Sequence, residues 1–194
     1  LFCSGSLPMS SFYDELINRA KKIDEDFCLF DSLEKEIVEK QVQILLEERK
    51  KGEVEGALFG VPFLVSNDFI TSDLFIKKNS DNFYSRASKN TTLIRRMLNE
   101  GAVLLGKTKN SNFKNLSLTS TITNPHNHNF SAGLTAASSA VSVSTGIVPI
   151  SIASQTNTTL ITNAAYCGVY GYTPSHKLFP LTGLKTISPS FDNS

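Results

Sequence analysis

The sequence predicts an α/β fold, in which helices alternate with the apolar strands of one layered sheet. Residues 60–65 (GVPFLV) form an apolar run with the length of a buried strand. Residues 92–100 have the apolar spacing of a helix, Gly101 is placed to end it, and residues 102–106 form a second apolar run. Helices that alternate with continuous apolar strands are typical of a sheet whose faces are covered by helices.

Two helices are predicted before this sheet. The first spans residues 10–22 and places three apolar side chains on one face: Phe12, Leu16 and Ile17. Asp31, with Glu34 three residues later, resembles a capping box. That pattern predicts a long charged helix that runs to about Lys51 and ends at Gly52.

A second alternation of elements follows in the C-terminal half. Residues 136–145 predict a helix of small residues that ends at Gly146, and residues 147–153 predict an apolar strand. A short helix is expected from Thr159, followed by a strand over residues 167–172. The half thus repeats the order of helix and strand seen earlier in the chain.

The stretch from Asn115 to His176 contains no Asp, Glu, Lys or Arg and is rich in Ser, Thr, Asn, Ala and Gly. A low-complexity linker would have this composition. The linker interpretation fails, because several residues have the spacing of buried elements: Val141, Val143, Ile147, Val148, Ile150, Ile152 and Leu160. We expect a buried, uncharged centre whose small side chains let backbone segments approach closely.

The composition is that of an ordinary soluble chain, with 194 residues of which 40% are hydrophobic and 19% charged. A formal net charge of +1 gives no electrostatic reason to expect a nucleic-acid partner, and no apolar run reaches the length of a membrane span. Cys3, Cys28 and Cys167 are too scattered for a disulfide framework or a metal site, so we expect no cofactor. Reduced cysteines favour a cytoplasmic location.

The two ends of the sequence suggest a partial chain. The sequence begins at Leu1 rather than Met, and it ends in a Ser- and Asn-rich stretch over residues 189–194. Loose polar ends of this kind are where chains are cut most readily. We therefore expect a fragment or a trimmed protein.

Several short motifs follow one another in order: GVP from Gly60, GAVLLGKT from Gly101, NP at Asn124, and CGVYG from Cys167 with Pro174 close behind. In order and spacing they resemble the amidase signature family, in particular its fatty-acid-amide-hydrolase-like and amidotransferase A-subunit-like branches. The resemblance covers most of residues 58–183. It implies an amidase-signature fold, a mixed β-sheet covered by helices, of which this chain is an N-terminal partial domain.

The resemblance also implies a division of the chain and a site. Residues 1–57 would form an N-terminal helical region, and residues 58–194 the signature core, truncated at its C-terminus. Family members hydrolyse amides with a Lys, a Ser in a cis peptide bond and a nucleophilic Ser. On the matching positions of this sequence stand Ser66 for the Lys, Thr135 for the cis-Ser and Thr159 for the nucleophile.

The polar neighbours of these positions differ from the family pattern as well. The segment matching the family's oxyanion loop reads Gln155, Thr156, Asn157, Thr158, where the family has Asp and two glycines. Ile161 and Asn163 replace an Arg and a Pro, and Asn112 replaces a Glu. The scaffold glycines and apolar strands are kept while the charged residues of the site are not.

These substitutions predict that amide hydrolysis is lost. A serine or threonine hydroxyl is a poor nucleophile until a base takes its proton, and the hydroxyl of Ser66 is no base near neutral pH. Few substitutes are available in the sequence. His126, His128 and His176 are the histidines of the uncharged stretch, and Lys77, Lys78 and Lys107 are the lysines nearest the motifs.

Three functional hypotheses follow. The first is a pseudo-amidase that retains binding of an amide or acyl small molecule, or that acts as an inactive partner in a homo- or hetero-oligomer. The second is a divergent amide hydrolase that uses Thr159 as its nucleophile with an imported base. The third is a truncated product without a selected function, whose exposed apolar edges would favour aggregation.

Overall fold

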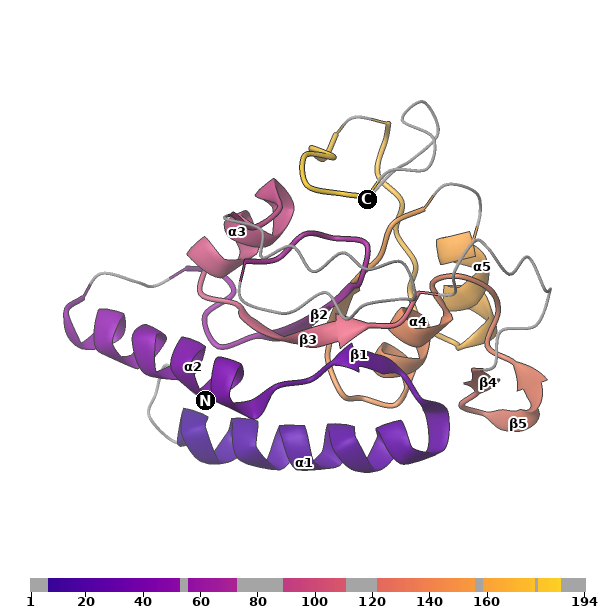
Figure 1. Ribbon diagram of the computed structural model, residues 1–194, viewed down its shortest axis with the longest axis horizontal. Helices are drawn as coiled ribbons and strands as arrows, with labels where there is room; N and C mark the ends of the chain where they lie inside the picture. Colours follow the sequence, from indigo (N-terminus) through magenta and orange to yellow (C-terminus); the bar gives the residue numbers. More distant parts are fainter. Residues whose placement is uncertain are drawn as a thin grey trace, which may run out of the picture.

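A four-stranded sheet of mixed direction forms the centre of the computed structural model (Figure 1). The structure describes residues 7–52, 56–72, 89–110, 122–155, 159–176 and 178–185. The strand order is β1 (Phe30–Ser32), β3 (Val103–Thr108), β2 (Pro62–Ser66) and β6 (Ile150–Ile152). β3, β2 and β6 are parallel, and β1 pairs antiparallel with β3. The carboxyl ends of the three parallel strands therefore meet at one edge of the sheet.

Both faces of the sheet are covered by apolar residues from helices. The first face packs against α1 (Met9–Phe27) and α4 (Ala137–Ser144), with Leu64 and Leu105 pointing toward them. The second face packs against α3 (Thr92–Asn99), whose Ile94 is buried with Phe63 and Val65. This alternation along β2 follows from strand geometry, in which successive side chains point to opposite faces.

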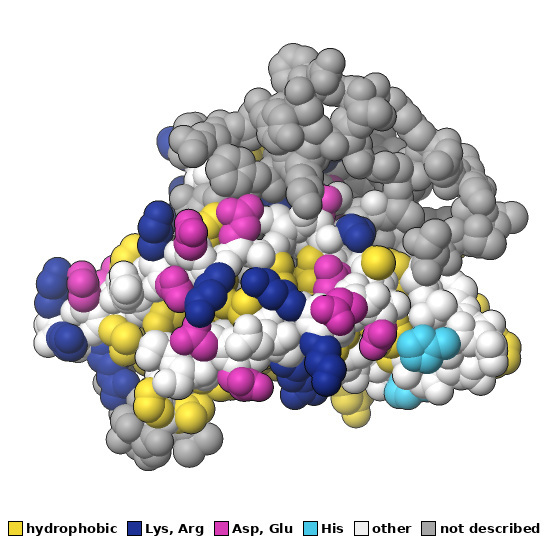
Figure 2. Space-filling model, turned by 60° about the horizontal axis from the view of Figure 1, so that its bottom comes forward, with side chains coloured by type: hydrophobic (Ala, Val, Ile, Leu, Met, Phe, Trp, Pro, Cys, Tyr) yellow, Lys and Arg dark blue, Asp and Glu magenta, His cyan; other side chains and the backbone are white. Residues whose placement is uncertain are grey.

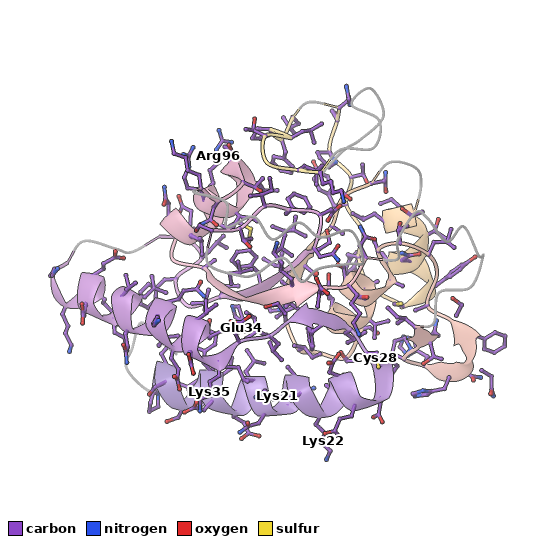
Figure 3. The ribbon with its side chains drawn as sticks, viewed as in Figure 1. Lys21, Lys22, Cys28, Glu34, Lys35 and Arg96 are labelled. Atoms are coloured by element: carbon purple, nitrogen blue, oxygen red, sulfur yellow. The ribbon has the colours of Figure 1, made fainter. Side chains whose placement is uncertain are left out.

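The helices α1 and α2 (Lys35–Lys50) lie along one side of the molecule and share its core with the sheet. The buried hydroxyl of Tyr13 on α1 donates to the carbonyl of Gly60, 3.0 Å away, and burial raises the pKa of this phenol. Lys35 lies at the start of α2 beside α1, with Nζ 2.6 Å from the Asp14 carboxylate (Figure 3). Both groups of that pair are about half exposed, so it adds little to stability.

A side chain of α2 completes the hydrogen bonding of β3. The pairing of β2 with β3 shifts between Phe63 and Leu64, so a bulge interrupts the ladder beside Leu104. The amide of Gln41 takes the place of a neighbouring strand there. Its Nε2 donates to the Leu104 carbonyl at 2.9 Å, and its Oε1 accepts from the Leu104 N–H at 3.0 Å. Gln41 therefore pairs with β3 on the side away from β2, beyond the residues of β3 that pair with β1.

A small hairpin and one further helix complete the described elements. β4 (Thr123–Asn124) pairs antiparallel with β5 (Asn127–Ser131), whose residues are all exposed. α5 (Thr159–Tyr166) packs beside α4. The Nδ2 of Asn124 donates to the carbonyl of Tyr166 at 2.7 Å and so ties the hairpin to α5.

Most of the expected elements are confirmed. The first helix, the strand from residue 60, the helix that ends at Gly101, the strand after it, the helix that ends at Gly146 and the helix from Thr159 are all present. Gly101 and Gly146 have φ values of 82° and 69°, in the left-handed region that glycine adopts without strain. The boundary at residues 57 and 58 stays a prediction.

The expected capping box is wrong. Asp31 lies inside β1, between residues that pair with Thr108 and Lys107. The N-cap of α2 is Glu34, in an extended conformation and with no side-chain cap. Its carboxylate instead accepts from the Ser32 hydroxyl at 3.1 Å. Pairing with the sheet edge therefore overrides the local capping pattern.

The strand expected over residues 167–172 is also wrong, and the one expected over residues 147–153 is shorter than expected. Gly168 has φ of 68° and Tyr170 is fully exposed, so residues 167–172 turn directly after α5 and form no strand. β6 keeps only Ile150–Ile152. The buried centre is confirmed at α4, where Ala137–Ser142 are all buried, but β5 lies in the same uncharged stretch and is exposed.

The surface over α1 and α2 carries charges of both signs. Figure 2 shows Lys and Arg side chains interspersed with Asp and Glu over this face, in keeping with the small net charge. Lys21 and Lys22 of α1 are exposed there, on the part of the helix turned from the sheet (Figure 3). Among the described residues, no helix combines the length and the apolar character needed to cross a membrane.

Candidate functional site

The position that matches the family's lysine lies at the carboxyl end of β2. Ser66 is the last residue of this fully buried strand and is 1% exposed. Its hydroxyl donates to Oδ1 of Asp68, two residues later. On the neighbouring strand, Ser66 is in register with Thr108. The polar end of β2 is thus directed to a carboxylate, which is an acceptor only.

The same carboxylate joins two of the parallel strands. The other oxygen of Asp68, Oδ2, accepts from the hydroxyl of Ser154, which follows β6. Both oxygens of Asp68 are therefore engaged by hydroxyl donors. The resulting cluster, Ser66, Asp68 and Ser154, is called the Asp68 cluster below. It lies where the carboxyl ends of β2 and β6 meet.

The strand β3 contributes a buried lysine near this cluster. Lys107 is fully buried, and its Nζ donates to the carbonyl of Phe69 at 2.7 Å. Burial lowers the pKa of Lys107 to about 8, against the carboxylates of Asp31 and Asp68, which raise it. Lys107 is in register with Val65 and Thr108 with Ser66, so Lys107 points to the opposite face of the sheet from Thr108.

The segment that carries Thr135 is fixed between β3 and α5. Thr135 is half-buried in the turn before α4. On one side, the hydroxyls of Thr108 and Ser139 are 2.9 Å apart and connect β3 to α4. On the other side, the N–H of Leu134 donates to Oδ1 of Asn163 on α5 at 2.9 Å. These contacts hold the turn in place without using the side chain of Thr135.

Gly133 shows how closely this turn approaches α5. It has φ of 118°, and a Cβ at this position would stand 1.9 Å from Oδ1 of Asn163. Only glycine allows this approach, because any other residue would clash and would be strained at that φ. Gly133 therefore has a direct packing role between this turn and α5.

Thr159, which matches the nucleophile, is the first residue of α5 and is half-buried. Gln155 lies before it, and its Oε1 accepts from the hydroxyl of Thr173 at 3.2 Å. Thr156, Asn157 and Thr158 of the expected oxyanion loop lie outside the described residues, as do Asn112, Lys77 and Lys78. α5 packs against α4, so the helices that begin after Thr135 and at Thr159 are neighbours.

The structure thus brings together the three segments that carry Ser66, Thr135 and Thr159. β2 and β3 pair at Ser66 and Thr108, Thr108 contacts α4, and the turn before α4 contacts α5. These contacts join the segments and not the three side chains themselves. A direct meeting of the three hydroxyls stays a prediction.

Two buried polar atoms close to the Thr135 turn have no hydrogen-bond partner among the described residues. They are the hydroxyl of Ser138, in the first turn of α4, and Nδ2 of Asn163. Both residues are 0% exposed. Buried polar groups are nearly always paired. The hydroxyl of Ser138 and Nδ2 of Asn163 therefore distinguish this region as one where two polar groups are free to bind a ligand.

The histidines of the uncharged stretch make other contacts. Nε2 of His126 is 2.9 Å from the carbonyl of Cys167, and the ring of His128 stacks against Phe27 with centroids 4.9 Å apart. His176 is exposed. Within the described ranges, no three His, Cys, Asp or Glu side chains gather into a metal-binding group.

Sequence reasoning missed Asp68 and Ser154. Asp68 was visible as an acidic residue directly after a buried strand, which is where the functional residues of parallel sheets gather. Its bond to Ser154, far along the chain, could be known only from the pairing of β2 with β6.

Comparison with known proteins supports the resemblance. Residues 12–194 match the family model described as Amidase. The A subunit of the glutamyl-tRNA(Gln) amidotransferase of Staphylococcus aureus is 29% identical over 191 residues, which are 94% of this chain and 39% of that relative. The native peptide amidase of Stenotrophomonas maltophilia has a TM-score of 0.87 at 25% identity, over 97% of this chain and 41% of that one.

A second similar structure is a vestigial protein complex described as revealing the evolutionary origins of an s-triazine catabolic enzyme. It has a TM-score of 0.86 and 26% identity, over 98% of this chain and 43% of that one. The chain therefore spans about two fifths of the length of its relatives and has, over that length, the amidase-signature fold. It belongs to the amidase signature family.

Proposed function

We propose that this chain is a pseudo-amidase, a member of the amidase signature family that binds an amide or acyl group without hydrolysing it. The observation that carries the proposal is the bonding of Ser66. A hydroxyl stands where the family has an amine, and it donates to the carboxylate of Asp68. The side chain at residue 66 is therefore a neutral hydroxyl that donates a hydrogen bond to an anionic carboxylate.

The chemistry of the family requires an amine at this position. A neutral Lys amine takes a proton from the cis-Ser, which in turn takes one from the nucleophile. A serine hydroxyl cannot begin that sequence, and a carboxylate is a weaker base than an amine. Both oxygens of Asp68 also already accept hydrogen bonds, from Ser66 and Ser154. The Asp68 cluster therefore leaves Thr159 without an evident base.

Lys107 is an unsuitable replacement for the missing amine, although its pKa is lowered to about 8. Its Nζ is engaged by the Phe69 carbonyl, and its side chain lies on the opposite face of the sheet from Thr108. Thr108 contacts α4, the helix that follows Thr135. Since a base must reach the proton it abstracts, Lys107 is on the wrong face.

The polar groups near the Thr135 turn support ligand binding. The hydroxyl of Ser138 and Nδ2 of Asn163 are buried and unpartnered among the described residues, and Thr135 and Thr159 add half-buried hydroxyls. Neutral hydroxyl and amide groups suit the carbonyl and N–H of an amide better than they suit a charged ligand. We infer that an amide or acyl group is the class of ligand that the site recognises.

A partner role is consistent with the same proposal. The relative from Staphylococcus aureus is one subunit of an amidotransferase by name, and a second similar structure is a protein complex. We infer that a family member without hydrolysis would act within a homo- or hetero-oligomer, through the binding of its ligand or through its fold.

The test measures binding and turnover on the same purified protein. Oleamide and simple aryl amides are titrated by calorimetry, and product is followed by chromatography. We expect saturable binding with no hydrolysis above buffer. The Thr135→Val variant should bind about fivefold to tenfold more weakly, because one hydroxyl hydrogen bond is lost. Thr123→Val, at a half-buried threonine of the hairpin, is the matched control and should bind as the unsubstituted chain does.

Hydrolysis that exceeds the buffer rate and disappears in Thr159→Ala would overturn the proposal in favour of a divergent amidase. A chain that neither binds nor hydrolyses any of these amides would remove the ligand-binding part of the proposal. A large oligomer that forms without ligand and releases no monomer on dilution would point to aggregation of an unselected product.

A further inference from the structure

A cavity of about 410 Å³ lies between β6 and the helices α4 and α5. In Figure 1, these two helices lie side by side. The other walls are α3 and the chain after α5, residues 169–174, together with the ring of Phe179. Several separate segments thus enclose one space, and its volume falls in the range of small-molecule sites.

The cavity exists because several of the residues that face it are small. Ala136, the N-cap of α4, and Ala140 line it from one helix, and Ala164 lines it from α5. Ala153 lines it directly after β6. An alanine side chain ends at Cβ, so these four positions leave space that larger residues would fill. The uncharged stretch of the sequence therefore forms a cavity where its helices meet the sheet.

The wall after α5 is fixed in place at both of its ends. The N–H of Val169 donates to the carbonyl of Ala164 at 2.9 Å. The hydroxyl of Thr173 donates to Oε1 of Gln155 at 3.2 Å. Between them, a Cβ at Gly171 would lie 2.8 Å from the Cβ of Ala164, so the backbone here packs directly on α5. The cavity is thus formed without a ligand, as most small-molecule sites are.

The lining of the cavity is apolar and uncharged. Of the described residues that line it, none is Asp, Glu, Lys, Arg or His. A charged ligand would lose its hydration there without meeting a counter-charge, so a neutral ligand is favoured. Three aromatic rings also line the cavity, those of Tyr170, Tyr172 and Phe179. Aromatic side chains pack well against a second aromatic ring, so they favour an aromatic ligand.

One buried polar group in the wall has no partner. The hydroxyl of Ser151, the middle residue of β6, makes no hydrogen bond within the part of the chain that the structure describes. Ser151 is in register with Leu64, so its side chain is on the face of the sheet that packs against α4. Ser139 also lines the cavity, but its hydroxyl is paired with that of Thr108 at 2.9 Å. Ser151 is therefore the buried hydroxyl that can donate to a ligand.

The volume of the cavity limits the size of the ligand. In another protein, an apolar cavity of about 150 Å³ holds one benzene molecule. The cavity beside β6, at about 410 Å³, has more than twice that volume. It therefore suits two fused aromatic rings with short substituents.

We propose that this cavity binds a neutral two-ring aromatic molecule with one carbonyl group, whose oxygen accepts a hydrogen bond from the hydroxyl of Ser151. The proposal goes beyond the proposed function and does not depend on it, because none of Thr135, Ser138 and Asn163 lines the cavity. Binding in the cavity and binding at the Thr135 turn can therefore be tested separately.

The test titrates the purified chain into prodan, 6-propionyl-2-(dimethylamino)naphthalene, which is a neutral two-ring ketone. Its emission brightens and moves to shorter wavelength in an apolar site, and it moves to longer wavelength when the carbonyl accepts a hydrogen bond. We expect saturable binding of one prodan per chain. In Ser151→Ala the affinity should fall about fivefold to tenfold and the bound probe should emit at shorter wavelength, because one hydrogen bond is lost.

The matched control for this variant is Ser142→Ala. Ser142 is a buried serine of α4 whose hydroxyl donates to the carbonyl of Ser138 at 2.7 Å, and it does not line the cavity. Ser142→Ala should bind prodan with the affinity and the emission wavelength of the unsubstituted chain.

A second pair of variants locates the probe. Ala140→Leu places a larger side chain in the cavity and should weaken binding at least about tenfold. Ala165→Leu makes the same change at an exposed alanine of α5 outside the lining, so it should bind as the unsubstituted chain does. Circular dichroism shows whether each variant is folded. If Ala140→Leu is not, Ala140→Val fills part of the same space and should weaken binding by a smaller factor.

The proposal fails on any of four results. A folded chain that does not bind prodan would show that the cavity takes no such ligand. Equal affinity and wavelength in Ser151→Ala and Ser142→Ala would remove the hydrogen bond to the carbonyl. Equal binding by the leucine variants at residues 140 and 165 would place the probe on the exposed surface. A dimer that Ala140→Leu dissociates, without prodan binding, would make a second copy the occupant. None of these results bears on whether the chain binds or hydrolyses amides at the Thr135 turn.

Discussion

A single carboxylate organises the polar residues at the carboxyl ends of β2 and β6. Asp68 accepts from Ser66 and Ser154, and Lys107 lies close enough for that carboxylate to raise its pKa against the larger effect of burial. The hydroxyls that could take part in proton transfer are thus directed to an acceptor. At the scale of single residues, Asp68 therefore links β2 to the residues that follow β6.

Replacing Lys107 by Met isolates the contribution of the buried amine to stability. With a pKa of about 8 when folded, against an ordinary value of 10.5, the folded chain binds fewer protons than the unfolded chain between these values. The contribution of Lys107 to stability therefore becomes more favourable as pH rises through this window. The free energy of unfolding of the unsubstituted chain, relative to Lys107→Met, should increase by about 2 kcal/mol between about pH 7 and pH 9.5.

Chemical denaturation of both chains at each pH measures this difference. Using the difference removes the contribution of Tyr13, whose raised pKa has the opposite effect at higher pH. A difference that does not change with pH would contradict the burial of an amine with a lowered pKa at residue 107.

Asn163 and Ser138 differ in hydrogen bonding: Oδ1 of Asn163 accepts from Leu134, whereas the hydroxyl of Ser138 has no partner among the described residues. Asn163→Leu removes the acceptor of the Leu134 N–H and should lower the free energy of unfolding by about 1–3 kcal/mol. Ser138→Ala removes a buried hydroxyl without a partner among the described residues and should leave stability unchanged or raise it. Thermal unfolding of both variants checks the order, and a larger loss in Ser138→Ala would contradict it.

The elements are held in register by contacts that cross between the N-terminal helices and the sheet. Gln41 of α2 binds the N–H and C=O of Leu104 on β3, and Tyr13 of α1 binds the carbonyl of Gly60 just before β2. The residues at the carboxyl end of β2 are therefore positioned in part by helices far from them. Loss of these contacts should loosen the sheet before it affects the turn at Thr135.

Gln41→Ala should destabilise the fold through β3. The variant leaves the N–H and the C=O of Leu104 without their partner, so the free energy of unfolding should fall by about 2–3 kcal/mol. Urea denaturation measures this loss. The exposed neighbour variant Ile44→Ala, on the same helix, should change stability by less than about 0.5 kcal/mol. Equal losses in the two variants would contradict the role of the Gln41 amide.

Sequence patterns predicted the elements whose own residues decide their structure. β2 and β3 are continuous apolar runs, and α3 and α4 end at glycines with positive φ. The three-residue strand β1 and the exposed strand β5 have no such pattern, because pairing with a neighbouring strand makes them strands. Residues 167–172 have the apolar content of a strand, but the chain makes a left-handed turn at Gly168 and these residues form no strand.

At the scale of the whole molecule, the family and the fold could be predicted because motifs such as GVP and GAVLLGKT are local, and the match to the family confirms them. The positions Ser66, Thr135 and Thr159 came from the same motifs. Their surroundings could not be predicted, since the bonds from Asp68 to Ser154 and from Leu134 to Asn163 connect segments far apart in the chain. The substitutions at these three positions raise the question of whether the chain has lost amide hydrolysis.

Labelling with a fluorophosphonate tests that loss most directly, because the reagent forms a covalent bond only with an activated hydroxyl. The purified chain is incubated with the probe and its intact mass and peptides are measured, with Thr159→Ala as the comparison. Since no base is assigned to Thr159, we expect no adduct on either protein. A stoichiometric adduct on Thr159 that is absent from Thr159→Ala would contradict it.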